Sequence, residues 1–275
     1  MSTSDRTIQS RADAFFDETA SYWRDVYDRH GIEGAIYRQR RDKILDLVDV
    51  LNPGPGARLL EVGAGAGGLS VALAGRGHRV HAVDSSPEMV RLIVERSRAE
   101  GHDERLSAGV EDVHRLSFAA KSFDLVVAVG VVPWLHAPEQ AVAEMARVLR
   151  PGGGLVLTAD NRARLNVITE PRGHPLLSAV RTMRRMWRER RTGPSTSAVS
   201  RQHSRAQVRR MIAGAGLDVV AGQTLGYGPL TFNGRPLLSD ERALILHRRL
   251  QALADRGTPG LRAMGWHYVV GARKP

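Results

Sequence analysis

Cysteine is absent from the 275 residues, and aromatic residues make up only 5% of them. Without cysteine the chain can form no disulfide and offers no thiolate as a nucleophile or metal ligand. The longest apolar run, residues 125–135, is too short to span a bilayer. The N-terminus is polar and contains acids, so it lacks the basic start and apolar core of a signal peptide. We therefore expect a cytoplasmic protein.

Lysine is also scarce, although the chain carries a net charge of +11. Residues 1–150 contain 19 basic and 22 acidic side chains, whereas residues 151–275 contain 21 and 7. The basic second part could meet nucleic acid, anionic lipid or an acidic substrate. However, lysine occurs only at positions 43, 121 and 274, and a genome with arginine-rich codon usage produces such a bias without any partner. The charge alone therefore leaves the partner open.

Strands and helices are expected to alternate between residues 58 and 160. The segment Phe123–Val129 has almost no polar side chains, which is typical of a parallel strand covered on both faces. Residues 138–149 have apolar side chains at helical spacing on one face. The expected strands are residues 58–62, 79–83, 105–110, 123–129, 154–159, 217–225 and 266–273. This pattern predicts an α/β fold with a Rossmann-like, doubly wound, mainly parallel seven-stranded sheet.

Helical segments lie on either side of this pattern and within it. Residues 8–29 and 34–51 are expected to be helices, the first with an aromatic side. We predict a helical N-terminal extension or lid over residues 1–52, and one domain over 53–275 with insertions at about 161–203 and 228–262. The second insertion is expected to hold a helix at about 239–256. The basic helix expected at 176–191 could cover the site as a lid or rest peripherally on an anionic membrane.

A glycine-rich turn joins the strand at 58–62 to the next helix. Glycines there allow a tight turn and the close approach of a ligand, and the following helix N-terminus offers free N–H groups. The spacing also satisfies the dinucleotide pattern G-x-G-x-x-G. Asp84 closes the second strand, where an acid can accept hydrogen bonds from ribose hydroxyls. These features predict a nucleoside-cofactor site but do not separate NAD from S-adenosylmethionine.

Further motifs, which follow one another along the chain, help to choose between these two cofactors. Glu61 stands two residues before the first glycine, and Glu111-Asp112-Val113 leads to Ser122-Phe123-Asp124-Leu125. The segment Glu144-x-x-Arg147 then runs into Arg150-Pro151-Gly152-Gly153-Gly154. With these motifs the sequence resembles the class I S-adenosylmethionine-dependent methyltransferases, in the type 11 branch similar to ubiquinone and menaquinone biosynthesis enzymes. The resemblance covers roughly residues 40–160.

The resemblance implies roles for individual residues. Asp84 would hold the ribose hydroxyls, Ser85 and Met89 would border the adenine, and Asp112 with the Val113 backbone would bind the adenine edge. Tyr22 belongs to an aromatic helix that in relatives can close over the cofactor. The residues expected near the ribose, the methionine part and the transferred methyl are Glu61, Gly63, Gly65, Gly67, Val129 and Gly130.

The acceptor side is less defined, because Pro133 and Trp134 stand where relatives often carry polar residues or histidines. This departure favours an apolar or planar acceptor with Trp134 as a pocket wall. His136 and Tyr227 are candidate catalytic residues. Tyr227 and Phe232 are also candidates for the acceptor pocket. The histidines show no metal-ligand spacing, so we expect no metal.

We therefore expect an enzyme that methylates a small molecule, with oxygen favoured over nitrogen or carbon. Methyl transfer from a sulfonium depends mainly on orientation, which can contribute roughly 7–11 kcal/mol. One alternative is a nucleic-acid methyltransferase, although no Asn-Pro-Pro-Tyr-like segment and no RNA-binding module is evident. A non-catalytic cofactor-binding subunit and an NAD-dependent dehydrogenase are further alternatives. The sequence leaves the acceptor and the oligomeric state open.

Overall fold

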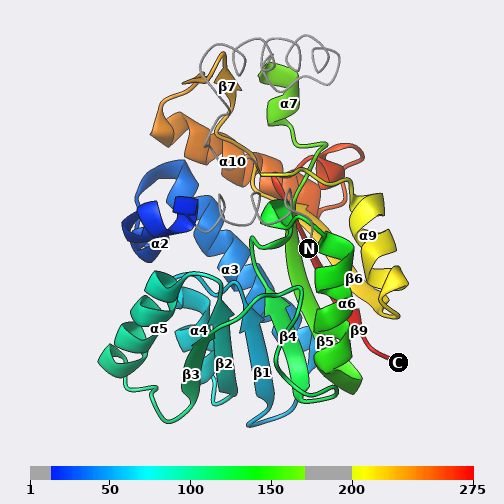
Figure 1. The fold of residues 1–275 in the computed structure, drawn as a ribbon. Coiled ribbons are helices and arrows are strands. Elements are labelled where there is room, and N and C mark those ends of the chain that lie inside the picture. Colours follow the sequence, from blue (N-terminus) through cyan, green and yellow to red (C-terminus); the bar gives the residue numbers. More distant parts are fainter. Residues whose placement is uncertain (1–13, 171–199) are drawn as a thin grey trace, which may run out of the picture.

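A computed structural model describes residues 14–170 and 200–275. Its centre is a seven-stranded sheet in the order β3-β2-β1-β4-β5-β9-β6 (Figure 1). The strands are β1 (Arg58–Val62), β2 (Arg79–Asp84), β3 (Leu106–Val110), β4 (Phe123–Ala128), β5 (Leu149–Asp160), β6 (Asp218–Leu225) and β9 (His267–Arg273). Strands β1 to β5 pair in parallel, and β9 lies antiparallel between β5 and β6. The predicted mainly parallel seven-stranded α/β sheet is confirmed.

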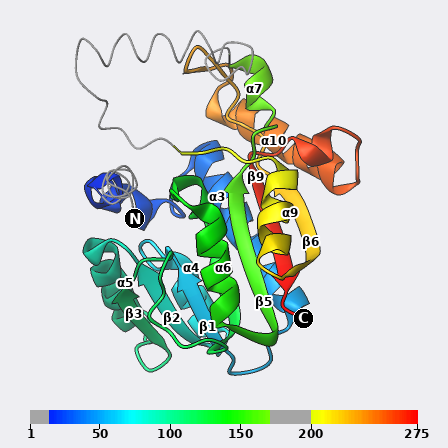
Figure 2. The same cartoon turned by 45° about the vertical axis from the view of Figure 1, so that its right-hand side comes forward.

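Helices cover both faces of the sheet (Figure 2). On one face lie α3 (Gly31–Leu51), α4 (Gly68–Gly75) and α5 (Pro87–Ala99). The other face is covered by α6 (Pro138–Val148) and α9 (Arg205–Gly214). Strand side chains alternate between the two apolar layers, as the pleat requires. Both layers are buried, so the strand ends are held in fixed positions.

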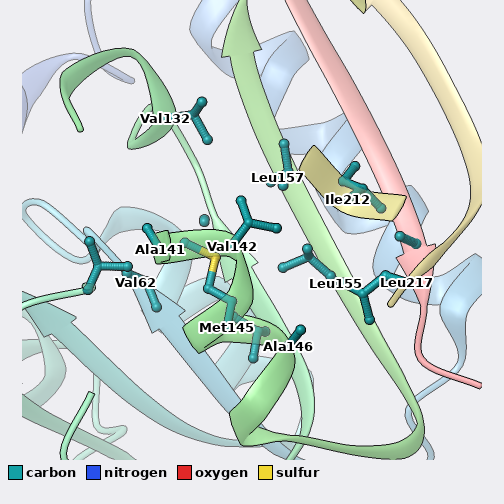
Figure 3. Packing of buried hydrophobic residues seen from close by; sticks show 14 of the residues in the cluster. Val62, Val132, Ala141, Val142, Met145, Ala146, Leu155, Leu157, Ile212 and Leu217 are labelled. Carbon is teal, nitrogen blue, oxygen red and sulfur yellow. The ribbon is translucent and has the colours of Figure 1, made fainter. Parts of the chain in front are cut away.

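The core under α6 shows why this helix forms and where it packs. Pro138 occupies its first turn, and the apolar side chains of Ala141, Val142 and Met145 recur at helical spacing. They pack against Leu155 and Leu157 of β5 (Figure 3). Helix α9 completes this layer and begins with a capping box. The packing fixes β4 and β5, whose carboxyl ends lead into the site.

The remaining elements gather beyond the carboxyl ends of the parallel strands (Figure 1). Residues 14–18 are helical, and α2 follows at Ala20–Asp25. Helix α10 packs through Ala243 against Ile32 and Ile36 of α3. The other elements are η1 (Val132–Trp134), α7 (Asn166–Thr169), β7 (Thr231–Phe232), β8 (Arg235–Pro236), α10 (Asp240–Asp255) and η4 (Leu261–Ala263).

Three element boundaries differ from expectation by at least three residues. The helix expected over residues 8–29 ends with α2 at Asp25. Helix α3 begins at Gly31 rather than residue 34. Strand β5 begins at Leu149 rather than 154, because Leu149 pairs with Phe123 before the register shifts and Gly154 pairs with Leu125. The basic helix expected at 176–191 lies outside the described residues. Within the described ranges, no helix is both long and apolar enough to cross a membrane.

Candidate active site

A cavity lies along the edge where the parallel strands end. It extends from β2 and the segment after β3, past β1 and β4, to the end of β5 and the start of β9. The strand order changes direction between β1 and β4, which is where open α/β sheets bind their ligands. Phe16, Trp23 and Tyr27 from the N-terminal helices cover the cavity. The chain therefore surrounds the cavity with segments that are far apart in sequence.

The glycine loop lies between β1 and α4 with a left-handed backbone. Gly63, Gly65 and Gly67 have φ values of +62°, +52° and +76°. A Cβ on Gly63 would lie 2.4 Å from a methyl carbon of Val131, whereas one on Gly65 would meet no atom within 4 Å. Gly63 is therefore needed for packing, while Gly65 leaves space open for a ligand. Gly67 does not line the cavity, because it caps α4 and packs against Ile93.

Asp84 fixes the shape of this loop from the end of β2. Its Oδ2 accepts a hydrogen bond from the backbone N–H of Gly65 at 2.9 Å, and its Oδ1 accepts one from Ser86 at 3.1 Å. Ser85 and Met89 line the cavity beside it. Ser86 caps α5 by accepting from the Met89 N–H, and its hydroxyl donates to the Asp17 carboxylate. The N-terminal helical segment is thus tied to the cofactor side of the cavity.

Glu61 lies under the loop as a buried carboxyl group. It is 2% exposed, and the Ser70 hydroxyl donates to its Oε2 at 2.5 Å. Burial raises the pKa of Glu61 to about 8, although the Ser70 hydrogen bond opposes the rise. A cationic ligand in the cavity would favour the ionised carboxylate. The site therefore fits a positively charged ligand such as a sulfonium or an ammonium.

Asp112 and Val113 line the cavity after β3. Partial burial raises the pKa of Asp112, but hydrogen bonds from the backbone and the ring of His114 outweigh burial and hold this pKa below its usual value. Asp112 is thus an ionised acceptor suited to an amino group. The loop that carries it is held by Glu144 and Arg147, which bond to the backbone at Leu116. The Glu144-x-x-Arg147 motif therefore supports the site without lining it.

Arg40 of α3 provides a buried cation beside the cavity. Its side chain is 6% exposed, stacks over the Tyr37 ring at 4.6 Å, and its Nε has no hydrogen-bond partner. A Cβ on Gly130 would lie 3.6 Å from an Arg40 guanidinium nitrogen. The Gly130 N–H itself donates to the Thr158 hydroxyl at 2.8 Å. A guanidinium with free bonding capacity next to the end of β4 fits a carboxylate.

Several predicted residues lie together in the cavity lining. Trp134 is one of them, and its indole packs against the rings of Phe15 and Phe16 at 5.4 and 5.2 Å. The predicted cofactor residues that line the cavity are Glu61, Gly63, Gly65, Asp84, Ser85, Met89, Asp112, Val113, Val129 and Gly130. The residues predicted to bind the cofactor and Trp134, predicted as the acceptor wall, thus line one cavity.

Four other candidates are placed elsewhere. The Tyr22 hydroxyl donates to Glu33 at 2.6 Å, and its ring packs edge-on against Trp23 with centroids 5.1 Å apart. Trp23 lines the cavity, whereas Tyr22 does not. His136 lies against His114, with ring centroids 3.8 Å apart. The Tyr227 hydroxyl donates to the Leu261 carbonyl at 2.6 Å. Phe232 lies on the β7–β8 hairpin with 56% of its surface exposed.

Sequence reasoning missed residues that complete the cavity. Tyr37 and Arg40 come from the helix expected over residues 34–51, for which no site residue was predicted, and their i, i+3 spacing could have indicated a shared face. Asp160, Trp266 and His267 come from the ends of β5 and β9. The only sequence feature that could have indicated these three residues was their expected position at the edge of the sheet where the parallel strands end. The acceptor half was thus the less predictable one.

Residues 60–157 match the family described as a methyltransferase domain. Over 156 residues the chain is 32% identical to the ubiquinone biosynthesis O-methyltransferase of Xylella fastidiosa, which covers 56% of this chain and 60% of that protein. The chain thus spans about three fifths of the relative's length.

Two solved structures share the fold. The magnesium protoporphyrin IX methyltransferase of Synechocystis matches with a TM-score of 0.65 and 15% identity over 98% of this chain and 100% of that one. The cyclase SpnF matches with a TM-score of 0.65 and 17% identity over 96% and 95% of the two chains. The family match agrees with the cofactor expected from the motifs. Together, the family match over residues 60–157 and the sheet order agree with the resemblance to class I S-adenosylmethionine-dependent methyltransferases that the motifs carry.

Proposed function

We propose that the protein binds S-adenosylmethionine and transfers its methyl group to a small planar acceptor, most readily to oxygen. One observation carries the proposal: a single cavity combines the glycine loop and Asp84 with a separate aromatic wall at Trp134 and Trp266. The similarity to an O-methyltransferase of ubiquinone biosynthesis supports oxygen as the accepting atom. Among the described residues, no arginine or lysine of the basic second part lines this cavity, which does not favour a nucleic-acid substrate.

Different residues of the cavity would bind chemically different parts of the cofactor. Asp84 at the end of β2 would accept from the ribose hydroxyls, and Asp112 would accept from the adenine amino group. Arg40 would hold the methionine carboxylate, and Glu61 would favour the positive charges. When bound, the cofactor supplies an activated methyl group on a sulfonium. With these three parts held by the residues after β1 to β3 and by Arg40, the methyl group would be presented toward the β4–β5–β9 side of the cavity.

The acceptor would lie between the aromatic side chains and the end of β4. Trp134 and Trp266 offer flat apolar surfaces, and Phe15 and Phe16 pack on Trp134 from the N-terminal segment. This cover excludes water and aligns the acceptor oxygen with the methyl–sulfur bond. Such orientation can supply roughly 7–11 kcal/mol of the barrier reduction.

Calorimetric titration with S-adenosylhomocysteine, S-adenosylmethionine and NAD tests the cofactor assignment. We expect both adenosyl compounds to bind and NAD not to bind. Asp84→Asn should weaken S-adenosylhomocysteine binding by about 10–100-fold, since it removes charged hydrogen bonds worth roughly 1.5–3 kcal/mol. Asp103→Asn, a change in the exposed turn before β3, is the matched control and should leave affinity unchanged. Tight NAD binding without S-adenosylhomocysteine binding would contradict the proposal.

A further inference from the structure

An acid and a histidine face each other at the end of the cavity remote from Asp84. Asp160 is the last residue of β5 and His267 the first of β9, and the two are directly paired across the antiparallel ladder. Side chains of such a pair lie on the same face of the sheet. The His267 Nδ1 lies 3.4 Å from Asp160 Oδ1, and both residues line the cavity. The chain thus builds a histidine–aspartate pair into the wall of the proposed acceptor site.

The surroundings hold the imidazole in one orientation. The Trp266 ring stacks on His267 with centroids 5.6 Å apart and planes 6° apart, and the Tyr37 ring lies 6.1 Å away. The His267 side chain is 6% exposed and that of Asp160 is 18% exposed. Because Nδ1 is the atom turned to the carboxylate, it carries the proton, and Nε2 keeps the lone pair. A packed ring with one nitrogen fixed is the arrangement that a general base requires.

The charges around the pair favour a neutral imidazole and an ionised carboxylate. Burial lowers the pKa of His267, and Arg40 and Arg164 lower it further, while the bond to Asp160 opposes them. Burial would raise the pKa of Asp160, but the hydrogen bond from His267 and the two arginines hold it below its usual value. Tyr37 is the remaining titratable side chain facing the ring, and burial raises its pKa. The histidine is therefore ready to accept a proton at neutral pH.

The position of the pair relative to the cofactor residues decides which ligand it meets. The glycine loop, Asp84 and Asp112 follow β1, β2 and β3, on one side of β4. Asp160 and His267 belong to β5 and β9, on the other side. Among the described residues, His267 is the one histidine that lines the cavity. A ligand beside it would be the methyl acceptor rather than the cofactor.

Resting on the proposed function, we propose that His267 is the general base for the acceptor, that Asp160 positions it, and that the acceptor presents an aromatic hydroxyl. Nε2 removes the hydroxyl proton while the oxygen electron pair forms a bond to the methyl carbon. The methyl–sulfur bond breaks, and its electron pair remains on the sulfur of S-adenosylhomocysteine. The proton then leaves His267 for solvent. A phenolic hydroxyl, with a pKa near 10, suits an imidazole base better than an aliphatic alcohol.

Nitrogen NMR of the S-adenosylhomocysteine complex tests the pair without any acceptor. We expect His267 in the wild type to be neutral at pH 7 with its proton on Nδ1. In Asp160→Asn, which no longer offers an ionised acceptor, the proton should shift toward Nε2. A wild-type His267 that is protonated on Nε2 or doubly protonated at pH 7 would overturn the proposal.

A second measurement adds 4-nitrophenol as the acceptor probe, because its phenolate absorbs at longer wavelength than the phenol. In the ternary complex with S-adenosylhomocysteine, the wild type should bind the probe as phenolate with an imidazolium signal at His267, and His267→Gln should bind it as phenol. With S-adenosylmethionine, His267→Gln should methylate the probe about 10²–10⁴-fold more slowly and lose the acidic limb of the pH profile.

The controls separate this proposal from the function on which it rests. His30→Gln changes an exposed histidine that does not line the cavity and should keep the wild-type rate and pH profile. His267→Gln should keep the wild-type affinity for S-adenosylhomocysteine. A His267→Gln enzyme with the wild-type rate and pH profile would overturn the base assignment alone. Absence of S-adenosylhomocysteine binding to the wild type would instead overturn the proposed function.

Discussion

The two ends of the cavity are built in different ways. At the cofactor end, the loop after β1 is held by Asp84 at the end of β2, only 19 residues beyond Gly65. At the acceptor end, Asp160 lies beside His267, which follows more than 100 residues later, and Tyr37, whose ring packs on His267, comes from a helix before the sheet. The cofactor end is thus a local motif, whereas the acceptor end exists only after the whole sheet has formed.

This difference has a chemical counterpart. The cofactor end presents backbone N–H groups and carboxylates, which suit polar groups of fixed identity. The acceptor end presents the rings of Trp134 and Trp266 with a single titratable pair. Every protein that uses the same cofactor can keep the first end. The second end can be rebuilt from insertions and strand ends to suit a different acceptor, as expected when function resides in a site placed on a common fold.

We expect the largest effect on one end of the cavity alone from a side chain that fills the open space at the glycine loop. Gly65→Val places a branched side chain in the open space beside Asp84, at a φ of +52°. We expect S-adenosylhomocysteine affinity to fall by about 100-fold or more, because overpacking alone costs roughly 1–3 kcal/mol and backbone strain adds to it. Calorimetry measures this change.

Gly152→Val is the matched control for that variant. Gly152 also has a positive φ, +77°, and its Cβ would meet no atom within 4 Å, but it lies outside the cavity lining. It should lose stability through the same strain and keep its cofactor affinity. Equal losses of affinity in the two variants would mean that Gly65 acts only through folding.

An intermediate effect is expected at Glu61, where function and stability oppose each other. Its pKa of about 8 in the folded chain exceeds the ordinary value of 4.5. An acid whose pKa is raised by folding contributes stability that is present below pH 4.5 and is lost as the pH rises to 8, on the order of 5 kcal/mol in total. Glu61→Gln should remove this loss, so its unfolding free energy should exceed that of the wild type above pH 8. Urea unfolding across this pH range measures the difference.

Cofactor binding supplies the other half of this test. The ionised Glu61 favours the cationic cofactor, so wild-type affinity for S-adenosylmethionine should rise with pH toward 8. The Glu61→Gln variant should bind more weakly and without this pH dependence, because its amide cannot ionise. Wild-type affinity that is flat with pH would contradict the buried, protonated state.

The cofactor end of the cavity could be predicted from the sequence to a greater extent than the acceptor end. Strand positions, the glycine loop and Asp112 were predictable because each depends on residues close in sequence or on ordered motifs. Even there, Tyr22 was predicted beside the cofactor, whereas its helical neighbour Trp23 lines the cavity and the Tyr22 hydroxyl donates to Glu33. Local patterns therefore identify an element more reliably than the face it presents.

At the acceptor end, the sequence shows which residue types are present but not which other residues they contact in the fold. His136 and Tyr227 were reasonable candidates by chemistry, but tertiary contacts with His114 and Leu261 place them outside the cavity lining. His267 was overlooked because nothing in a strand reveals that its first residue faces Asp160. That pairing depends on β9 running antiparallel to β5, which the alternating pattern cannot specify.

The smallest effect is expected from Tyr227→Phe, which tests whether this residue belongs to the acceptor end. Its ring is 1% exposed and its hydroxyl donates to the Leu261 carbonyl at 2.6 Å, so the hydroxyl holds η4 rather than a ligand. Removing it should cost about 1 kcal/mol of unfolding free energy, the usual value of one hydrogen bond. The affinity for S-adenosylhomocysteine and the rate with 4-nitrophenol should be unchanged. A slower rate at full stability would instead assign Tyr227 to the chemistry and extend the acceptor end beyond β9.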